Sequence, residues 1–163
     1  MVYFTSDTHL GHNNILKYRP QFSSIEEHDT AIFDSISKLT KRDDLFILGD
    51  FIFDSPNYQH YIDTFYKFPC KIRLVMGNHD SRLLYNEPRF DIQLPLFSYK
   101  NFWISHCPIH PQELRSRIAN IHGHLHGVTI DSPHYFNVNL DNNNFQLVSL
   151  DTIKSHYKEQ LCI

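Results

Sequence analysis

The sequence lacks the features that mark membrane and secreted proteins. No apolar run approaches the length that spans a bilayer. The opening MVYFTSDTHL has no basic segment followed by a long apolar one, so we do not expect a secretory signal. Cysteine is scarce: Cys70, Cys107 and Cys162 lie far apart and form no CxxC pair, which favours reduced thiols over disulfides. Together these absences predict a cytoplasmic protein with no membrane partner.

An excess of positive charge is also absent. The chain has 15 Lys and Arg against 18 Asp and Glu, a formal net charge of −3, which gives no electrostatic reason to expect a general nucleic-acid binder. Bound metal ions would change the local field, so this balance does not exclude phosphate ligands. Histidine, by contrast, is abundant, with 12 in 163 residues, and the hydrophobic content of 41% is that of a globular protein. We expect one domain spanning residues 1–163.

Short apolar runs that are rich in β-branched and aromatic residues recur along the chain, bounded by Gly, Asp or Asn. This pattern predicts strands in a sheet covered on both faces. The runs are Val2–Phe4, Leu45–Leu48, Ile72–Met76, Phe102–Ile104 and Ile118–Ile121. Two later runs, Tyr135–Leu140 and Phe145–Leu150, flank the turn-prone tetrad DNNN and predict a C-terminal hairpin.

Helical patterns separate the first strands. Ser23 or Ser24 can cap a helix, with Glu26 or Glu27 completing a capping box. Its buried stripe is expected at Ile25, Ile32, Ile36 and Leu39, which recur at helical spacing. A second helix is predicted to start near Pro56 and to bury Tyr58, Ile62 and Phe65. Alternating strands and helices indicate an α/β protein, and the late hairpin suggests a mixed sheet or a second sheet.

Side chains of metal-ligand types follow nearly every predicted strand. They form five clusters: Asp7-Thr8-His9, Gly49-Asp50, Gly77-Asn78-His79-Asp80, His106, and His122-Gly123-His124-Leu125-His126. Ligands in open α/β sheets sit outside the carboxyl ends of the strands, so these clusters should converge. In Asp7-x-His9 and His124-x-His126 an extended backbone would point both side chains the same way. The glycines in the clusters allow sharp turns and close approach to a ligand.

The donor set predicts the kind of metal. Imidazoles with carboxylate oxygens and no thiolate suit manganese, iron, zinc, nickel or cobalt rather than calcium. Seven donors exceed the needs of one four-coordinate zinc, so two metals sharing a bridging carboxylate fit better. Taken alone, DxH and GD are common, GNHD is compatible with a turn, and GHxH with a surface histidine pair. Their order and repeated placement after strands favour the metal site.

The motifs DxH, GD, GNH[DE], H and GHxH occur here in full and in order, from Asp7 to His126. With these motifs the chain resembles the calcineurin-like metallophosphoesterase superfamily. The stretches SDTHLGHNNI, LGDF and FNVNLDNNNFQLVSLDTI resemble its short single-domain members from phages and bacteria. The resemblance implies a four-layer α-β-β-α sandwich of two mixed sheets flanked by helices, with the site at the strand ends. It also implies a bacterial cell or a phage-infected host as the location.

The resemblance implies a role for each motif residue. Asp7, His9 and His126 would bind one metal, Asn78, His106 and His124 the other, and Asp50 would bridge both. Manganese is the leading choice, with iron, zinc, nickel or cobalt as alternatives. His79 would act as proton donor or transition-state stabiliser, and Asp80 would orient its imidazole.

Several other residues are assigned from their neighbourhood. His12 and Arg19 are the candidate substrate-binding groups, because a guanidinium can grip a phosphate with two hydrogen bonds. Arg82 and His110 are weaker candidates for the same role. His122 is expected to be packed beside the site rather than to be a ligand. His28, His60, His134 and His156 lack motif context and are expected at the surface.

These assignments predict a phosphoesterase that acts on a small phosphate ester, such as a nucleotide or cyclic nucleotide. A hydroxide shared by the two metals would attack phosphorus while His79 assists the leaving group. The segment GDFIFDS departs from the GDxVDRG of the superfamily's protein phosphatases and lacks its arginine, which disfavours a phosphoprotein substrate.

Three alternatives remain open. A nuclease would need a basic groove, and no dense Lys/Arg patch is visible, so a long nucleic acid is not favoured as a partner. A nucleotide pyrophosphatase is a second alternative within the enzymes. A non-catalytic protein-binding scaffold should have lost one of the motif residues, and none is missing.

Overall fold

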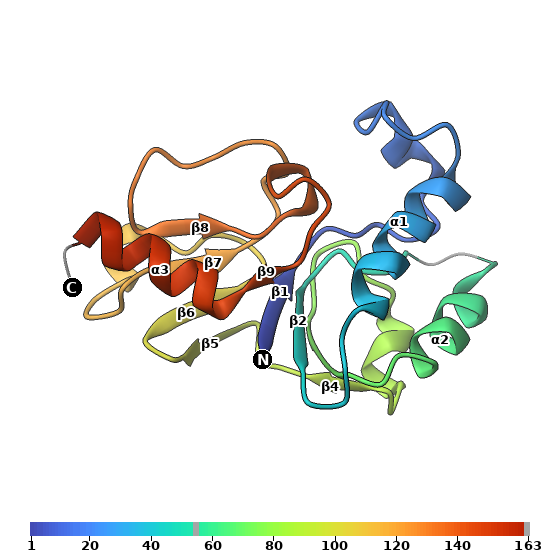
Figure 1. Ribbon diagram of the computed structural model, residues 1–163, viewed down its shortest axis with the longest axis horizontal. Helices are drawn as coiled ribbons and strands as arrows, with labels where there is room; N and C mark the ends of the chain where they lie inside the picture. The colour runs from blue at the N-terminus through green and yellow to red at the C-terminus, as the bar shows by residue number, and fades with distance from the viewer. Residues whose placement is uncertain (54–55, 162–163) are drawn as a thin grey trace.

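Two mixed β-sheets pack face to face between helices in the computed structural model, which describes residues 1–53 and 56–161 (Figure 1). The first sheet has the strand order β4-β3-β2-β1-β9. Its parallel strands are β1 (Val2–Thr5), β2 (Asp44–Leu48), β3 (Lys71–Val75) and β4 (Phe90–Ile92), and β9 (Val148–Ser149) pairs antiparallel with β1. The strands that the sequence predicted to begin at Val2, Leu45 and Ile72 are confirmed, and their ends lie within one or two residues of the predicted ends.

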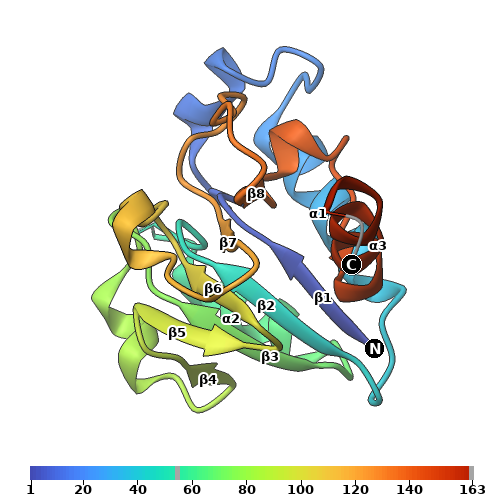
Figure 2. The ribbon, with the colours of Figure 1, turned by 90° about the vertical axis from the view of Figure 1, so that its left-hand side faces the viewer.

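The second sheet has the order β5-β6-β7-β8 and faces the first (Figure 2). It consists of β5 (Leu96–Tyr99), β6 (Phe102–Ser105), β7 (Asn120–His122) and β8 (Tyr135–Asn137), with only the β5–β6 pair antiparallel. The run expected at Ile118–Ile121 forms its strand two residues later. The mixed-sheet sandwich that the resemblance implied is confirmed.

The expected C-terminal hairpin is wrong. Its first half, β8, pairs with β7 in the second sheet, whereas its second half, β9, pairs with β1 in the first. The DNNN tetrad is not a two-strand turn, because Leu140–Asn142 form a short 3-10 helix, η4, capped by the Asn139 side chain. The chain therefore crosses from one sheet to the other at this point.

The helices flank the sheets. Figure 1 shows α1 (Ile25–Ser37) and α2 (Tyr58–Tyr66) beside the first sheet, and α3 (Leu150–Leu161) across the second. The Ser24 hydroxyl accepts from the Glu27 amide and caps α1, while the Glu27 carboxylate reaches back to Ser23. Helix α2 starts at Tyr58, two residues after Pro56, and has Asn57 as its N-cap. No helix in the described residues is long and apolar enough to cross a membrane.

Alternation along the strands of the first sheet feeds two cores. In β2, Leu45 and Ile47 join the core under α1 and α2, whereas Phe46 and Leu48 join the core between the sheets. Both faces of the strand are therefore buried, which explains its unbroken apolar run. Each fully buried side chain of this size stabilises the fold by about 1.5–3 kcal/mol. These two cores pack against both faces of the first sheet and hold it in place. The polar clusters follow the carboxyl ends of its strands.

Candidate metal centre

The loops that follow the strands are joined to one another by backbone hydrogen bonds. After β1 and β2, the Asp7 amide donates to the Gly49 carbonyl and the His9 amide to the Asp50 carbonyl, both at 2.9 Å. After β6 and β7, the Gly123 amide donates to the His106 carbonyl at 2.9 Å. The structure thus brings clusters from both sheets to one edge, as the strand-end argument predicted.

Two links cross between the sheets at this edge. The His106 Nδ1 atom lies 2.7 Å from the Leu48 carbonyl oxygen, and the His124 amide donates to the Asp7 carboxylate at 2.9 Å. A carbonyl can only accept, so Nδ1 of His106 carries a proton, and in a neutral ring its Nε2 presents a lone pair. The clusters of the second sheet are therefore held in a fixed orientation against those of the first.

One group of donors consists of Asp7, His9 and His126. One ligand atom of each lies within 4.8 Å of the others. The Nε2 atoms of His9 and His126 are 3.3 Å apart, and the second of these lies 3.9 Å from the Asp7 Oδ1. Burial lowers the pKa of His9 to about 2, and the neighbouring His126 and Arg19 add to this effect. His9 is therefore a neutral imidazole that offers a lone pair.

A second group lies beside the first and consists of Asn78, His106 and His124. The His106 Nε2 atom is 3.0 Å from the Asn78 side-chain oxygen and 3.2 Å from the His124 Nδ1. With Nδ1 as the donor to Leu48, a neutral His106 would face the Asn78 oxygen acceptor-to-acceptor. A cation between the two would resolve this repulsion.

Asp50 lies between the two groups. Its Oδ2 is 3.9 Å from the His9 Nε2, whereas its Oδ1 is 3.5 Å from the His106 Nε2. The carboxylate is 2% exposed, and Oδ1 also accepts from the His79 amide at 2.9 Å. One carboxylate therefore presents an oxygen to each group, which is the arrangement that a bridging ligand requires.

The donor set fits divalent metals. Buried polar atoms normally have partners, yet Asp7 Oδ1 is buried without one in the described structure. Burial also raises the pKa of Asp7, although hydrogen bonds and nearby histidines oppose the shift. A buried carboxylate oxygen without a donor, beside the imidazoles of His9 and His126, is an environment that a cation would complete.

The backbone at these donors differs from the expected extended form. Asp7, His9, Asp50, His124 and His126 all have positive φ, between 49° and 70°. The left-handed region costs a non-glycine residue about 1–2 kcal/mol. Asp7 and His9 do lie in one donor group, but through left-handed turns rather than by alternation along a strand, whereas His124 and His126 lie in different groups. Strain of this kind concentrates at functional sites, where the surrounding structure holds it in place.

Gly123 lies close to side chains of the loop after β1. A Cβ atom at this position would collide with the Ser6 hydroxyl and the Asp7 carboxylate. Gly49 has φ +83°, and a Cβ there would meet the His106 ring. Both glycines therefore make room for the predicted ligands.

Arg19 does not have the expected substrate-binding role. Its side chain is 1% exposed and bonds to Asp141 through Nε and Nη2, at 2.8 and 3.0 Å. Nη2 also donates to the Asp7 carbonyl, and Nη1 donates to the Thr8 carbonyl and to His28. All five N–H groups are thereby used, so the guanidinium has no donor left for a phosphate. Arg19 supports the site from inside the protein.

The expected surface position of His28 is also wrong. It is fully buried, with Nε2 2.8 Å from Arg19 and Nδ1 2.7 Å from Asp29. Arginine only donates, so His28 Nε2 accepts and Nδ1–H donates to Asp29. Asp29 also accepts from the Tyr61 hydroxyl and the Gly11 amide. A continuous polar chain thus leads from α2 through α1 to Arg19.

Asp141 connects this polar chain to the first donor group. Its Oδ2 lies 3.1 Å from Nδ1 of His126. Burial alone would raise the pKa of Asp141, but the hydrogen bonds from His126 and Arg19 outweigh it and hold the value at about 2. An ionised Asp141 accepts a hydrogen bond from the Nδ1–H of His126 and so directs the Nε2 of His126 toward the other donors. Sequence reasoning missed Asp141 because it lies in a segment that was interpreted as a turn.

Asp80 does not orient His79. Its Oδ1 accepts from the Phe51 and Ile52 amides, its Oδ2 accepts from the Gly77 amide, and no hydrogen bond joins it to the His79 ring in the described chain. Asp80 therefore ties the loop after β2 to the loop after β3. The His79 ring instead stacks on Phe53, with centroids 5.2 Å apart. Sequence reasoning missed Phe53, which carries no motif signal.

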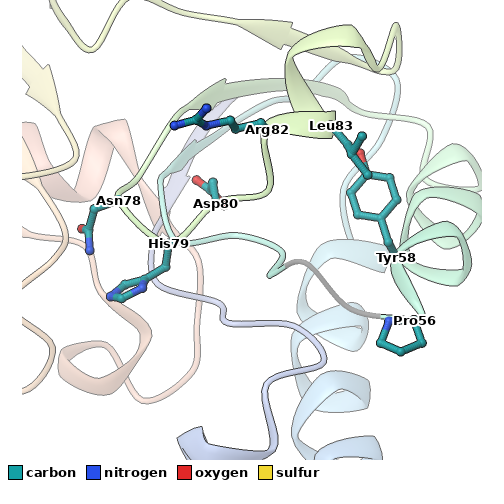
Figure 3. A pocket seen from close by; sticks show the side chains of 7 residues that line it. All are labelled: Pro56, Tyr58, Asn78, His79, Asp80, Arg82 and Leu83. Atoms are coloured by element: carbon teal, nitrogen blue, oxygen red, sulfur yellow. The ribbon is translucent and has the colours of Figure 1, made fainter.

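Two cavities open beside the donor groups and share His79. One, of about 810 Å³, is lined by Asn78, His79, Asp80 and Arg82 at one end and by Pro56, Tyr58 and Leu83 at the other (Figure 3). The other, of about 920 Å³, is lined by His9, His12, His126 and three aromatic side chains, Tyr18, Phe53 and Phe145. His12 stacks on Phe53, with ring centroids 4.1 Å apart, and so lies beside the site. Its role in binding substrate stays a prediction.

The remaining expectations concern residues at the margin. His122 is buried, as expected, and its Nδ1 bonds to the Gly123 carbonyl. Cys70 and Cys107 are free thiols, and Cys162 lies outside the described residues. Cys107 was not expected at the site, yet its sulfur lies within 4.8 Å of ligand atoms of His106 and His124. Partial burial raises the pKa of the Cys107 thiol, although the residue is exposed.

Comparison with known proteins identifies the family. The family model for calcineurin-like phosphoesterases matches residues 1–160, nearly the whole chain. The chain belongs to the calcineurin-like phosphoesterases. The DxH, GD, GNHD and GHxH motifs of this phosphoesterase are the segments that the structure brings together at one edge of the sandwich.

Relatives of the phosphoesterase occur in phages and archaea. The Gene 66 protein of Mycobacterium phage L5 is 35% identical over 81 residues, which cover 48% of this chain and 39% of the phage protein. The uncharacterized protein MJ1445 of Methanocaldococcus jannaschii is 28% identical over 164 aligned positions, 93% of this chain and 88% of that protein.

Solved structures share the fold. The protein of unknown function AQ665 from Aquifex aeolicus superposes with a TM-score of 0.74 at 25% identity, covering 95% of this chain and 98% of that one. The nuclease MPE of Pseudomonas putida superposes with a TM-score of 0.54 at 19% identity, covering 77% and 61% of the two chains.

Proposed function

We propose that this chain is a dinuclear metal-dependent phosphoesterase that hydrolyses a P–O ester bond of a small phosphate ester. The observation that carries the proposal is the position of Asp50, which presents one oxygen to each of two donor groups. Membership of the calcineurin-like phosphoesterases supports phosphoester hydrolysis as the reaction class. The substrate and the two-metal mechanism are the proposed part.

The first metal would be held by Asp7, His9 and His126, and the second by Asn78, His106 and His124, with Asp50 shared. Two bound cations would supply Lewis acidity toward a phosphoryl oxygen and lower the pKa of water. Manganese fits the mixed imidazole and oxygen donors, and iron, zinc, nickel or cobalt would also fit.

His79 would act on the leaving group. It lines both cavities, so a substrate placed over the donor groups would contact its imidazole from either side. Phe53 stacks on the ring and limits its orientations. A protonated imidazole can donate to the departing ester oxygen, a contribution of typically about 10²–10⁴-fold. His12, stacked on the same Phe53, would position the substrate beside it.

A substrate panel with manganese-loaded protein tests the proposal. It comprises a phosphomonoester, a linear diester, 2′,3′- and 3′,5′-cyclic nucleotides and short oligonucleotides. Metal-dependent hydrolysis of at least one small ester, lost after chelation and absent in Asp50→Ala, is the expected result. If no ester were cleaved with any divalent metal, the proposal would fail.

A nuclease is the second candidate, because a protein of this fold is a nuclease. The −3 formal charge of the chain gives little electrostatic support for a long polyanion. The oligonucleotide arm of the panel decides between the two: cleavage of oligonucleotides in preference to every small ester would favour the nuclease.

A further inference from the structure

The 920 Å³ cavity beside His9 and His126 has a chemical character that the phosphoesterase reaction does not explain. Its walls carry the aromatic side chains of Tyr18, Phe53 and Phe145, and its volume is in the range of small-molecule sites. We call it the aromatic cavity. A phosphoryl group needs cations and N–H donors, so aromatic rings that the site itself does not use are available to another part of the substrate.

Tyr18 is an exposed aromatic residue without a structural role. It follows the 3-10 helix η1 (Asn13–Lys17), and its side chain is 80% exposed. No side-chain hydrogen bond or ring contact involves it within residues 1–53 and 56–161. A large aromatic ring left open to solvent beside a cavity is available to stack on a ligand.

Phe145, across the cavity, is held in a strained conformation. It and Asn144 have φ of 57° and 50°, which is unusual for a bulky aromatic residue. The ring centroids of Phe145 and Phe22 are 4.8 Å apart, and the guanidinium carbon of the buried Arg19 lies 5.1 Å from the Phe145 centroid. The strain is therefore maintained by fixed neighbours, which makes Phe145 a rigid wall.

The rim of the cavity offers neutral hydrogen-bonding groups. The side-chain amides of Gln21 and Asn144 line it, and neither forms a hydrogen bond within the described part of the chain. An amide both donates and accepts, which matches the edge of a heterocyclic base. No Lys or Arg is among the described lining residues, which also include the ionised Asp141 carboxylate and four histidines. The cavity thus suits a neutral, planar group with polar edges rather than a second phosphate or an alkyl chain.

From these observations we infer that the aromatic cavity binds the nucleobase of a single nucleotide whose phosphate lies at the donor groups. This inference rests on the proposed function and names its substrate class. The cavity adjoins the first donor group through His9 and His126, so one molecule can occupy both. The lack of Lys and Arg among the described lining residues favours one nucleotide over a strand.

Calorimetric binding of adenosine 5′-monophosphate and ribose 5-phosphate to the manganese-loaded protein tests the inference. The two probes share the sugar and phosphate and differ only in the base. We expect the nucleotide to bind about 5- to 100-fold more tightly, the range that stacking on aromatic side chains provides. Tyr18→Ala should reduce this preference at least about threefold and leave ribose 5-phosphate binding unchanged. Tyr85→Ala, which removes a tyrosine that is 60% exposed outside the cavity, is the control and should change neither.

Equal affinity for the two probes, no binding of the nucleotide, or a base preference that survives Tyr18→Ala would each overturn the assignment. These outcomes are separate from failure of the proposed function. That failure would appear as the absence of metal-dependent hydrolysis of every ester in the panel, whatever the binding preference.

Discussion

The buried Arg19 and the partly buried Asp141 form a bidentate pair directly behind His126. The guanidinium donates through Nε and Nη2 to the two carboxylate oxygens, and one of these oxygens also lies 3.1 Å from the His126 Nδ1. Arg19 is only 1% exposed although it carries a full charge. Its enclosure by acceptors makes it a structural support for a predicted ligand.

Arg19→Met should therefore destabilise the protein and weaken metal binding together. Removing one partner of a buried ion pair typically costs about 3–5 kcal/mol. For a chain of this size such a loss lowers the melting temperature by roughly 10 °C. Loss of the support behind a metal-binding histidine lowers metal affinity about 10- to 100-fold. Thermal melts and metal titrations measure the two effects.

Lys17→Met is the matched control, because Lys17 is exposed and lies two residues away. It should change neither quantity. A stable Arg19→Met variant with unaltered metal affinity would show that the pair does not support the site.

Gly123→Ala should disrupt the site, whereas Gly127→Ala should not. A Cβ at Gly123 would strike the Ser6 hydroxyl and the Asp7 carboxylate, but a Cβ at Gly127 meets nothing within 4 Å. Overpacking of this kind costs about 1–3 kcal/mol. We expect lower stability and weaker metal binding for the first variant only, measured by denaturant unfolding and metal titration. Similar behaviour of the two alanine variants would contradict the close packing.

His79→Asn should leave metal binding intact and reduce turnover. His79 lines both cavities but belongs to neither donor group, so its loss removes proton transfer alone. The expected fall in kcat is about 10²–10⁴-fold. His60→Asn, at an exposed position of α2, serves as control and should retain full activity. Loss of metal from the His79→Asn protein would reassign this residue to metal binding.

Asp7→Asn should separate the stability of the metal-free protein from its response to metal. Asp7 is fully buried and its Oδ1 has no partner, so removing the charge should leave the metal-free melting temperature unchanged or higher. Manganese at 100 times its Kd should stabilise the wild type by about 2.7 kcal/mol. That stabilisation corresponds to roughly 5–10 °C in melting temperature.

In the Asp7→Asn protein the manganese-induced increase should fall to less than about half the wild-type value. Differential scanning calorimetry with and without manganese provides the comparison. An undiminished increase would show that the metal binds elsewhere.

The sequence predicted the elements whose signal is local. The strands β1, β2, β3 and β6 are built around short runs rich in apolar residues, and α1 has its capping serine. The prediction of a C-terminal hairpin was wrong because strand pairing depends on distant partners. β8 finds β7 and β9 finds β1, and nothing within residues 135–150 specifies that separation.

The same division holds at the site. Motif residues were found because their spacing after strands carries information. The environment of Arg19 was not predicted from the sequence, because its acceptors Asp7, Asp141 and His28 come from three separate segments. Asp80 was predicted to orient its sequence neighbour His79. Its carboxylate instead accepts hydrogen bonds from the amides of Ile52 and Phe51, which are 28 and 29 residues away. Long-range polar contacts are what single-sequence reasoning cannot place.

The most direct measurement is a crystal structure of the manganese-soaked protein with an anomalous difference map recorded at the manganese edge. The account predicts two peaks, roughly 3.5–4 Å apart, one on each side of the Asp50 carboxylate. One would contact Asp7, His9 and His126, and the other Asn78, His106 and His124. A single peak, or peaks remote from Asp50, would contradict the two-metal centre.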